Sequence, residues 1–462
     1  MRKVKAFLFS ALIFALVFAF CSCGDEEVIE EKKYPTKTLN VYNWGEYISN
    51  EDDEEYGLFD VNAAFEEYFN EHLADKYGFY VKVNYSTYAT NEDMYAKLTN
   101  SAVAYDIVIP SDYMIQKMIE GDMLLPLDFS LITNYGNVSD DFKNMYYDPD
   151  NAYSVPYTYG MVGIIYNSEF VDEELVGAEQ SWSLLWNQNA KGEQLDYDGK
   201  ILQFNNPRDA FASAMFWKGL DINSQSPADW TLALEALKAQ KPILQGYVND
   251  EIFNKMKSAS AWISSYYAGD FLTMAADNDD LRFYYPTEGT NYFVDAMCIP
   301  KTSRNPEIAN EYINYMIGLD AATANALYIG YASPNKAVTE SDYYREMLDY
   351  NYSIYDDDDN LIVDAWEVLY GKSKDEANAN YPFNPAYENY YKDESVDIQL
   401  HVNTLWESLK TENSTELWVH ITSIVIVVGV VSFASYDVYV KKKRSRAYRL
   451  RDKQARLAKQ AK

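Results

Sequence analysis

Two kinds of hydrophobic pattern alternate along most of the chain. Short apolar runs predict strands, and longer segments with apolar residues three or four positions apart predict helices. The first predicted strand, Leu39–Tyr42, is followed by the polar and aromatic stretch Asn43-Trp44-Gly45-Glu46-Tyr47. The pattern predicts further strands at 80–85, 105–110, 162–166, 201–204, 259–264 and 292–300, and helices at 61–73, 91–101, 113–120, 229–238 and 306–318.

This order of strands and helices is typical of an α/β protein with a mainly parallel sheet covered by helices on both faces. Ligands of such sheets bind at the carboxyl ends of the strands. Asn43–Tyr47 follows one predicted strand and Ser111–Tyr113 follows another. We therefore expect Trp44, Tyr47, Ser111 and Tyr113 to lie near one another.

The N-terminus has the layout of a secretory signal peptide. Three basic residues within 1–5 precede the apolar run Ala6–Phe20, which is short for a membrane-spanning helix. Cys23, preceded by the small residue Ser22, resembles a bacterial lipoprotein processing site and fits it better than Cys21 does. We predict a signal peptide at 1–23, lipidation of Cys23 and an acidic linker at 24–37.

A second apolar segment lies near the C-terminus. Leu417–Tyr436 is long enough to span a membrane, and Lys441-Lys442-Lys443-Arg444 follows shortly after it. Because basic residues favour the cytoplasmic side, the pattern predicts a transmembrane helix at 417–440 and a basic cytoplasmic tail at 441–462. The large preceding region would then lie outside the cytoplasm, attached to the cell membrane.

Charge narrows the range of partners. The chain of 462 residues has a formal charge of −32, yet 441–462 carries 11 Lys or Arg against one Asp. With +10 there and +3 in 1–20, residues 21–440 carry −45. Such a region repels nucleic acid and attracts cations, although surface acidity also serves solubility alone.

The sequence contains few of the residues that disulfides, metal sites and phosphate-binding loops require. The chain has three Cys, of which only Cys298 lies outside the leader, in an apolar run that predicts burial. No disulfide framework or Cys-based metal site is expected. Outside the predicted span the only histidines are His72 and His401, and no phosphate-binding glycine loop occurs. Acidic residues are abundant, so an enzyme that acts on glycans through paired carboxylates stays open as an alternative.

A series of motifs resembles the spermidine/putrescine-binding protein family of bacterial ABC transporters. The resemblance covers roughly residues 38–400. The motifs follow in the same order as in that family: Asn43–Tyr47, Tyr85–Tyr88 with Asn91–Leu98, Tyr105–Ser111 with Tyr113, Ser154–Tyr157 with Gly160, Ser181-Trp182 with Leu185-Trp186, Asp295 with Ile299-Pro300, and Ile329–Asn335.

The resemblance implies a periplasmic-binding-protein type II-like clamshell of two lobes. Each lobe would have a mixed, mainly parallel sheet flanked by helices, and the transmembrane helix would be added at the C-terminus. The implied division is 38–157 with 288–338 for lobe 1, and 158–287 with 339–410 for lobe 2. The resemblance also implies a polyamine ligand, putrescine or spermidine, held between the lobes, and an ABC permease with its ATPase as partners. Neither catalysis nor a cofactor nor a metal is expected.

The resemblance also implies roles for individual residues. Asp295 would be the main partner of an ammonium group, Trp262 would stack on the methylene chain, and Tyr331 would close the site. The full implied set is Trp44, Tyr47, Ser111, Tyr113, Asn206, Asp209, Trp262, Phe293, Asp295 and Tyr331. Asn206 stands where spermidine binders tend to have Asp, and Phe293 where they tend to have Trp. These departures favour putrescine, and another small solute in the same clamshell remains an alternative.

Overall fold

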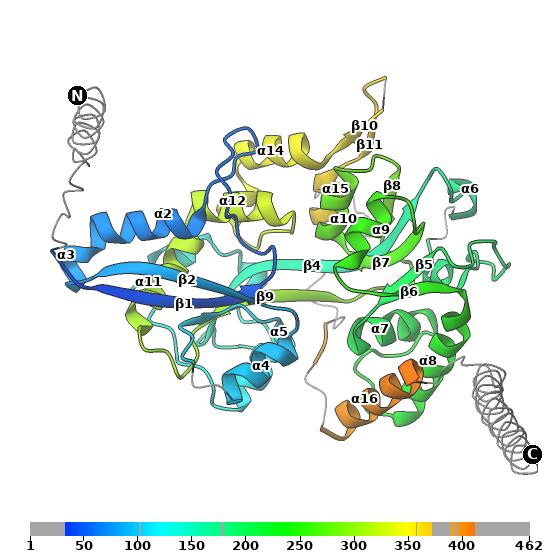
Figure 1. Cartoon of the computed structure of the whole chain (residues 1–462), viewed down its shortest axis with the longest axis horizontal. Coiled ribbons are helices and arrows are strands. Elements are labelled where there is room, and N and C mark those ends of the chain that lie inside the picture. The colour runs from blue at the N-terminus through cyan, green and yellow to red at the C-terminus, as the bar shows by residue number, and fades with distance from the viewer. Residues whose placement is uncertain are drawn as a thin grey trace, which may run out of the picture. The chain divides into compact units, whose positions relative to one another are not determined.

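The computed structural model describes residues 33–100, 103–176, 180–356, 358–371, 390–392 and 396–411 (Figure 1). Their contacts divide the chain into two units. Unit 1 comprises the described residues of Met1–Met161, Tyr267–Asp279 and Tyr292–Asp393. Unit 2 comprises those of Val162–Tyr266, Asp280–Asn291 and Glu394–Lys462.

The sheet of unit 1 has the strand order β2-β1-β3-β9-β4. β1 pairs in parallel with both β2 and β3, whereas β9 pairs antiparallel with β3 and β4. The strands are β1 (Thr36–Trp44), β2 (Tyr80–Tyr88), β3 (Ile107–Val108), β9 (Tyr292–Cys298) and the first part of β4 (Ser154–Asn167). Because β1 and β3 are parallel, the segments that follow them, Gly45–Tyr47 and Ile109–Ser111, leave the sheet at one edge.

The helices of unit 1 follow these strands, and α2 contacts β2 on one face of the sheet (Figure 1). Ser111 stands at the N-cap position of α5, as the sequence predicted. The helical segments are α2 (Val61–Tyr68), the π-helix η1 (Phe69–Leu73), α3 (Ala74–Tyr77), α4 (Asn91–Asn100), α5 (Asp112–Glu120), η2 (Thr133–Asn137), η3 (Asp140–Phe142), α10 (Ala268–Ala275), α11 (Pro306–Met316), α12 (Leu319–Ile329), α13 (Lys336–Thr339), α14 (Asp342–Tyr352) and α15 (Ala365–Tyr370). A hairpin of β10 (Ile354–Tyr355) and β11 (Leu361–Val363) precedes α15.

Unit 2 continues the strand order as β4-β7-β5-β6, with β8 paired antiparallel to the second part of β4. β5 is parallel to both β6 and β7. Its strands are β5 (Ile201–Phe204), β6 (Leu244–Val248), β7 (Ile263–Tyr267) and β8 (Leu281–Tyr284). Its helical segments are α6 (Glu173–Val176), η4 (Trp182–Trp186), α7 (Pro207–Trp217), α8 (Pro227–Gln240), η5 (Lys241–Ile243), α9 (Glu251–Lys257) and α16 (Val396–Thr411), which packs along α8 (Figure 1).

The predicted fold class is wrong in two respects. We expected a separate, mainly parallel sheet in each lobe, but β4 takes part in both strand sets, so the strands form one mixed sheet. We also expected a transmembrane helix. Within the described ranges no helix has the length and apolar composition needed to cross a membrane. The longest helix there, α16, has 16 residues and carries charges.

Other predictions fall on residues outside the described ranges. These are the signal peptide at 1–23 with Cys23, the span at 417–440 and the basic tail at 441–462. Most of the linker at 24–37 also lies there. The burial predicted for Cys298 is confirmed, since its side chain is inaccessible to solvent.

One predicted strand is out of position by several residues. The pattern predicted a strand at 259–264, but β7 begins at Ile263 and ends at Tyr267. Polar residues such as Ser264 and Ser265 ordinarily mark the end of an apolar run. Both serines are in fact completely buried within the strand, so the segment at the carboxyl end of β7 is Tyr267–Asp270.

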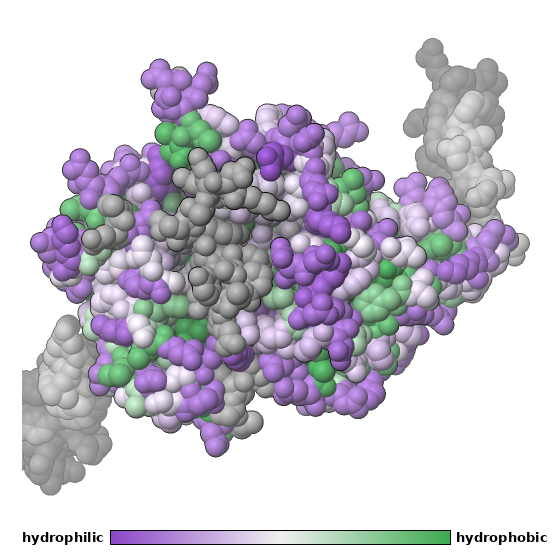
Figure 2. Space-filling view, turned by 180° about the vertical axis from the view of Figure 1, so that it is seen from behind, coloured by the Kyte–Doolittle hydropathy of each residue, from purple (hydrophilic) through white to green (hydrophobic). Residues whose placement is uncertain are grey.

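Among the coloured residues of the face in Figure 2, hydrophilic residues are widespread and hydrophobic residues form several patches between them. Inside unit 1, a buried carboxylate fixes the segment that leads into β4. Asp148 accepts hydrogen bonds from the backbone N–H groups of Ala152, Tyr153 and Ser154, and from the Ser154 hydroxyl, at 2.8–3.0 Å. This carboxylate therefore sets where β4 begins.

We expect Asp148→Ala to lower the free energy of unfolding by about 3 kcal/mol, because it leaves buried N–H groups without an acceptor. Denaturant unfolding of the purified protein measures this change. Asp150→Ala is the matched control, since Asp150 is exposed in the same turn and should change stability by less than about 0.5 kcal/mol. Equal losses in the two variants would contradict the role given to Asp148.

Candidate functional site

Asp295 is a buried carboxylate in the middle of β9. Its side chain is 3% exposed. One oxygen, Oδ2, accepts a hydrogen bond from the Tyr47 hydroxyl at 2.6 Å. The other, Oδ1, is buried and has no hydrogen-bond partner among the described residues. A buried carboxylate oxygen without a donor is costly, so the arrangement is suited to a ligand that brings a donor and a positive charge.

Tyr47 is held in place at several points. Glu46, with φ of 49°, turns the chain after β1. The carbonyl of Tyr47 accepts hydrogen bonds from the Asn43 side-chain amide and the Tyr157 hydroxyl. Its hydroxyl lies 2.8 Å from Thr158 Oγ1. Since the Tyr47 proton is donated to Asp295, the Thr158 hydroxyl must be the donor to Tyr47.

Burial changes the acidity of both partners. It raises the pKa of Asp295 to about 6, and the neighbouring Ser111 and Tyr47 hydroxyls, which favour the charged form, offset only part of this effect. Burial, followed by the nearby Asp295 charge, raises the pKa of Tyr47 well above its ordinary value. Tyr47 therefore stays protonated and a hydrogen-bond donor, whereas Asp295 titrates near neutral pH.

Aromatic rings lie around this pair. Tyr331 meets Tyr47 edge to face at 5.6 Å between ring centroids, and Phe293 lies 6.0 Å from Tyr331. Tyr267, at the end of β7, meets Phe293 at 5.4 Å. Gly269 allows this packing, because a Cβ there would lie 1.7 Å from the Tyr331 ring. The result is an aromatic wall formed by Tyr47, Tyr331, Phe293 and Tyr267.

Asn91, the first residue of α4, positions the two predicted site residues that follow β3. Its side-chain amide donates to Ser111 Oγ at 3.1 Å and to the Tyr113 hydroxyl at 3.0 Å. The Tyr113 hydroxyl in turn donates to Glu92 at 3.1 Å. Ser111 also pairs with Asp295 through the backbone, as an isolated bridge. The segment after β3 is thereby fixed beside the buried carboxylate.

Trp44 ends β1 in a half-buried position. Its indole N–H donates to the carbonyl of Ile109 at 2.9 Å, and its ring packs on Tyr88 at 4.7 Å and on Tyr47 at 6.5 Å. The structure thus brings together seven of the predicted residues within unit 1: Trp44, Tyr47, Ser111, Tyr113, Phe293, Asp295 and Tyr331.

Asp270 and Tyr267 belong to the same group but were not predicted from the sequence. Asp270 lies in the first turn of α10 and accepts a hydrogen bond from the Tyr331 hydroxyl at 3.0 Å. Both residues lie in the segment Tyr266-Tyr267-Ala268-Gly269-Asp270. The sequence would have indicated them if the end of the preceding strand had been predicted correctly. A carboxylate and a ring at the carboxyl end of a buried strand would then have been expected at the site.

Three predicted residues lie in unit 2, and the structure brings only two of them together. Asn206 caps α7, accepts from the backbone N–H of Asp209 at 2.8 Å and donates to its carboxylate at 2.9 Å. Trp262 instead precedes β7 and stacks on Phe170 at 4.8 Å. Because β5 and β7 are parallel, Trp262 lies at the amino end of these strands and Asn206 at the carboxyl end.

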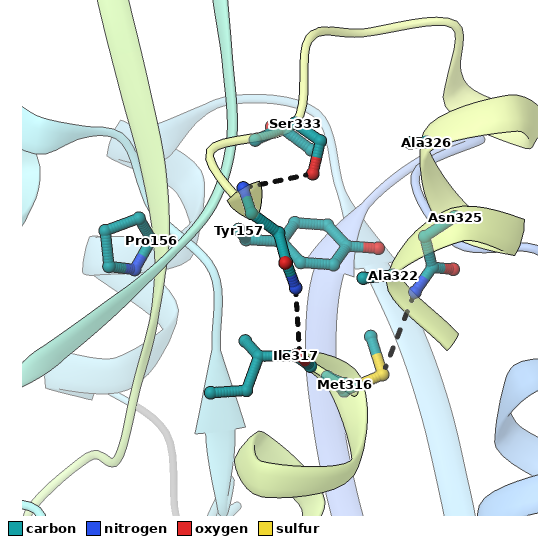
Figure 3. A pocket seen from close by; sticks show the side chains of 10 residues that line it. Pro156, Tyr157, Met316, Ile317, Ala322, Asn325, Ala326 and Ser333 are labelled. Carbon is teal, nitrogen blue, oxygen red and sulfur yellow. Dashed lines mark hydrogen bonds between the residues drawn. The ribbon is translucent and has the colours of Figure 1, made fainter. Parts of the chain in front are cut away.

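A cavity of about 10 Å³ lies next to Thr158 in unit 1 (Figure 3). Its lining includes Met316, Ile317, Asn325 and Asn335. The Asn335 side-chain amide donates to the carbonyl of Ile317 at 2.9 Å, and Asn325 Nδ2 lies 3.9 Å from Met316 Sδ (Figure 3). The space is about that of one water molecule. It is too small for an organic solute and is not the ligand site.

The mixed sheet and the carboxylate-aromatic site define an α/β binding protein. The chain belongs to the family of bacterial extracellular solute-binding proteins, whose model matches residues 63–347. It is 30% identical over 356 residues to the spermidine/putrescine-binding periplasmic protein of Escherichia coli, an alignment that covers 77% of this chain and 90% of the relative. It is 26% identical over 317 residues to the putrescine-binding periplasmic protein PotF of the same species, covering 66% of this chain and 79% of the relative.

The fold is also found in solved structures. The spermidine/putrescine ABC transporter substrate-binding protein PotD from Streptococcus pneumoniae superposes with a TM-score of 0.58 at 30% identity, covering 81% of this chain and 98% of that one. The expected type II-like binding-protein architecture is therefore supported, with the sheet corrected as described above.

We expect Asp295→Asn to stabilise the ligand-free protein at pH 7.5. A carboxyl whose pKa is about 6 when folded and about 3.9 when unfolded destabilises the folded state above pH 6. That penalty falls away as the pH decreases toward 4. The gain should be about 3 kcal/mol at pH 7.5, measured by denaturant unfolding, and should shrink at pH 4.5. A gain in stability that does not vary with pH would contradict the destabilising effect of the buried Asp295 carboxylate. The control is Asp150→Asn, because Asp150 is exposed.

We expect Gly269→Ala to displace the Tyr331 ring and weaken ligand binding about tenfold or more, because the new methyl group would overlap that ring. Isothermal titration with a diamine measures the change. Gly136→Ala is the matched control, since a Cβ at Gly136 meets nothing within 4 Å. Unchanged affinity in a folded Gly269→Ala protein would remove Tyr331 from the site.

Proposed function

We propose that this chain is the substrate-binding component of an ABC importer for polyamines, with putrescine as the preferred ligand. The observation that carries the proposal is the buried Oδ1 oxygen of Asp295, which has no donor among the described residues, in a carboxylate whose other oxygen accepts from Tyr47. The names of the relatives, a spermidine/putrescine-binding protein and a putrescine-binding protein, agree with it.

An alkyl ammonium satisfies the chemistry of this site. It donates to Oδ1 and neutralises the charge of Asp295, which removes the cost of burying an ionised carboxylate. The faces of Tyr47, Phe293 and Tyr331 suit both the methylene chain and the positive charge. Anionic solutes do not fit, because no positively charged side chain among the described residues contributes to the pKa of Asp295.

A second ammonium has candidate partners as well. Asp270 lies within reach of the Tyr331 hydroxyl, and Glu92 accepts from Tyr113. In unit 2, Asn206 and Asp209 remain proposed contacts of the ligand, whereas the position of Trp262 gives no support to its proposed stacking role. An amide at 206 and Phe rather than Trp at 293 favour a ligand with two charges over one with three.

The proposed partners are a membrane permease and its cytoplasmic ATPase, because a similar protein of solved structure is named as the substrate-binding protein of an ABC transporter. The relatives are periplasmic proteins by name, so we propose that this chain also acts outside the cytoplasm. Export would depend on the signal peptide at 1–23, and lipidation of Cys23 would attach the protein to the membrane surface. Binding is non-covalent and no turnover is expected.

Isothermal titration with putrescine, cadaverine, spermidine and an anionic control such as glutamate tests the proposal. We expect saturable binding of the diamines at pH 7.5 and about a 100-fold loss in Asp295→Asn, because that variant removes the counter-charge of a desolvated ammonium. Binding of no amine, or equal affinity in Asp295→Asn, would overturn the proposal.

The same titration has a predictable pH dependence. The amines remain protonated from pH 5 to 8, whereas Asp295 takes up a proton as the pH falls through about 6. Affinity for putrescine should therefore be nearly constant above pH 7 and about tenfold weaker at pH 5. A flat profile between pH 5 and 7.5 would contradict the assignment of Asp295.

A further inference from the structure

Asn91, the first residue of α4, is a buried amide whose hydrogen bonds lead toward the candidate site. Its side chain is 4% exposed. The residue before it, Thr90, caps the helix, because the Thr90 hydroxyl accepts from the backbone N–H of Asp93 at 3.1 Å. The Asn91 side chain instead contacts the N–H of Ser111 at 3.3 Å, Ser111 Oγ at 3.1 Å and the Tyr113 hydroxyl at 3.0 Å.

One of these contacts fixes the orientation of the amide. A backbone N–H donates and cannot accept, so the Asn91 oxygen must face the N–H of Ser111. The NH₂ group then faces the two hydroxyls, and it donates to each of them. Ser111 and Tyr113 are therefore both acceptors toward Asn91, and their own protons must point in other directions.

The proton of the Tyr113 hydroxyl has a defined acceptor. It is donated to Glu92 Oε1 at 3.1 Å. A hydroxyl oxygen that has accepted one hydrogen bond has capacity for a second, and donation to a carboxylate polarises it into a better acceptor. Asn91 and Glu92 together thus leave Tyr113 with a lone pair, rather than a proton, to offer to a ligand.

Ser111 and Tyr113 both lie near Asp295, and all of these residues belong to unit 1. Ser111 pairs with Asp295 through the backbone as an isolated bridge. Burial raises the pKa of Asp295, and the Ser111 hydroxyl offsets part of this rise. Burial raises the pKa of Tyr88 too, followed by the Asp295 charge and, more weakly, by Tyr113. Asp295 and Tyr113 therefore both lie within electrostatic range of one buried hydroxyl.

We propose that Asn91 is a positioning residue that makes the site selective for primary ammonium groups. The proposal rests on the polyamine-binding function given above. A primary ammonium has three N–H donors, and the acceptors offered are Asp295 Oδ1 and the lone pairs of Ser111 and Tyr113. Without Asn91 the two hydroxyls are free to turn their protons toward the ligand, where they repel its charge. A dimethylated ammonium has one N–H donor, which Asp295 alone satisfies.

A purely structural role for Asn91 makes a different prediction. If the amide only holds α4 against the segment after β3, its removal disturbs the site for every amine alike. Putrescine and N,N,N′,N′-tetramethylputrescine have the same charge and the same carbon chain, but they differ in the number of N–H donors. The ratio of their dissociation constants therefore reports on the orientation of the hydroxyls rather than on the general integrity of the site.

The test is Asn91→Leu, which keeps the approximate size of the side chain and removes its hydrogen bonds. Calorimetry on the full chain at pH 7.5 measures the dissociation constants of both amines. Binding of putrescine should weaken about tenfold and that of the tetramethylated amine by about twofold or less, because only the primary ammonium uses the two hydroxyls. The ratio of the tetramethylputrescine constant to the putrescine constant should thus fall about fivefold.

The matched control is Asn100→Leu, at the other end of α4. Asn100 is exposed, and its amide donates to the carbonyl of Ala96 within the helix. This variant should leave both constants within about twofold of the unsubstituted protein. Asn91→Ala is a second variant that carries the same expectation should the leucine variant fail to fold.

A double-mutant cycle tests whether Asn91 acts through Tyr113. Tyr113→Phe removes the hydroxyl that Asn91 orients and should by itself weaken putrescine binding. The double variant Asn91→Leu/Tyr113→Phe should lose less affinity than the product of the two single losses, because both changes remove the same lone pair from the site. A loss equal to that product contradicts the proposed route.

The outcomes separate this inference from the function on which it rests. If the unsubstituted protein binds no polyamine, the proposed function fails. If it binds putrescine but the ratio is unchanged in Asn91→Leu and Asn91→Ala, or changes equally in Asn100→Leu, the role of Asn91 is overturned and the function stands. Equal affinity of the unsubstituted protein for the two amines also overturns it. A ratio that falls in the Asn91 variants alone supports the inference.

Discussion

The site depends on the burial of one carboxylate. Ionised Asp295 destabilises the ligand-free protein by about 3 kcal/mol at neutral pH, given its pKa of about 6. Within the described part of the chain, a single oxygen of this carboxylate has a hydrogen-bond donor, the Tyr47 hydroxyl. The surrounding structure maintains this unfavourable state through the turn at Glu46, the Thr158 hydroxyl and the pairing of β9 with β4. A bound cation neutralises the buried charge and removes this destabilisation. The free energy of unfolding that the ligand-free protein lacks therefore contributes to ligand affinity.

The sequence predicted those parts of the site that follow regular patterns. Trp44, Tyr47, Ser111 and Tyr113 could be grouped because they follow strands that alternate with helices, and parallel strands end at one edge. Asp295 and Tyr331 could not be grouped in this way. Asp295 lies within an antiparallel strand, and Tyr331 lies in a loop, so both depended on the resemblance to a family.

The errors have physical causes too. The strand at 259–264 was predicted several residues too early, because the polar residues Ser264 and Ser265 interrupt the apolar pattern although both are buried inside β7. The same displacement concealed Tyr267 and Asp270. The single mixed sheet was missed because antiparallel pairing of β9 with β3 and β4 joins segments far apart in sequence, and such pairing leaves no local periodicity.

The position of α16 has a practical consequence for work on this protein and its relatives. The helix comes after the region matched by the family model, which ends at residue 347, so a shortened chain designed on that match would lack it. Such a chain would keep Asp295 and its aromatic neighbours while exposing the apolar face of α8 that α16 covers. A ligand profile measured on it would describe the truncated protein, and preferences compared across the family are meaningful only between chains of equal extent.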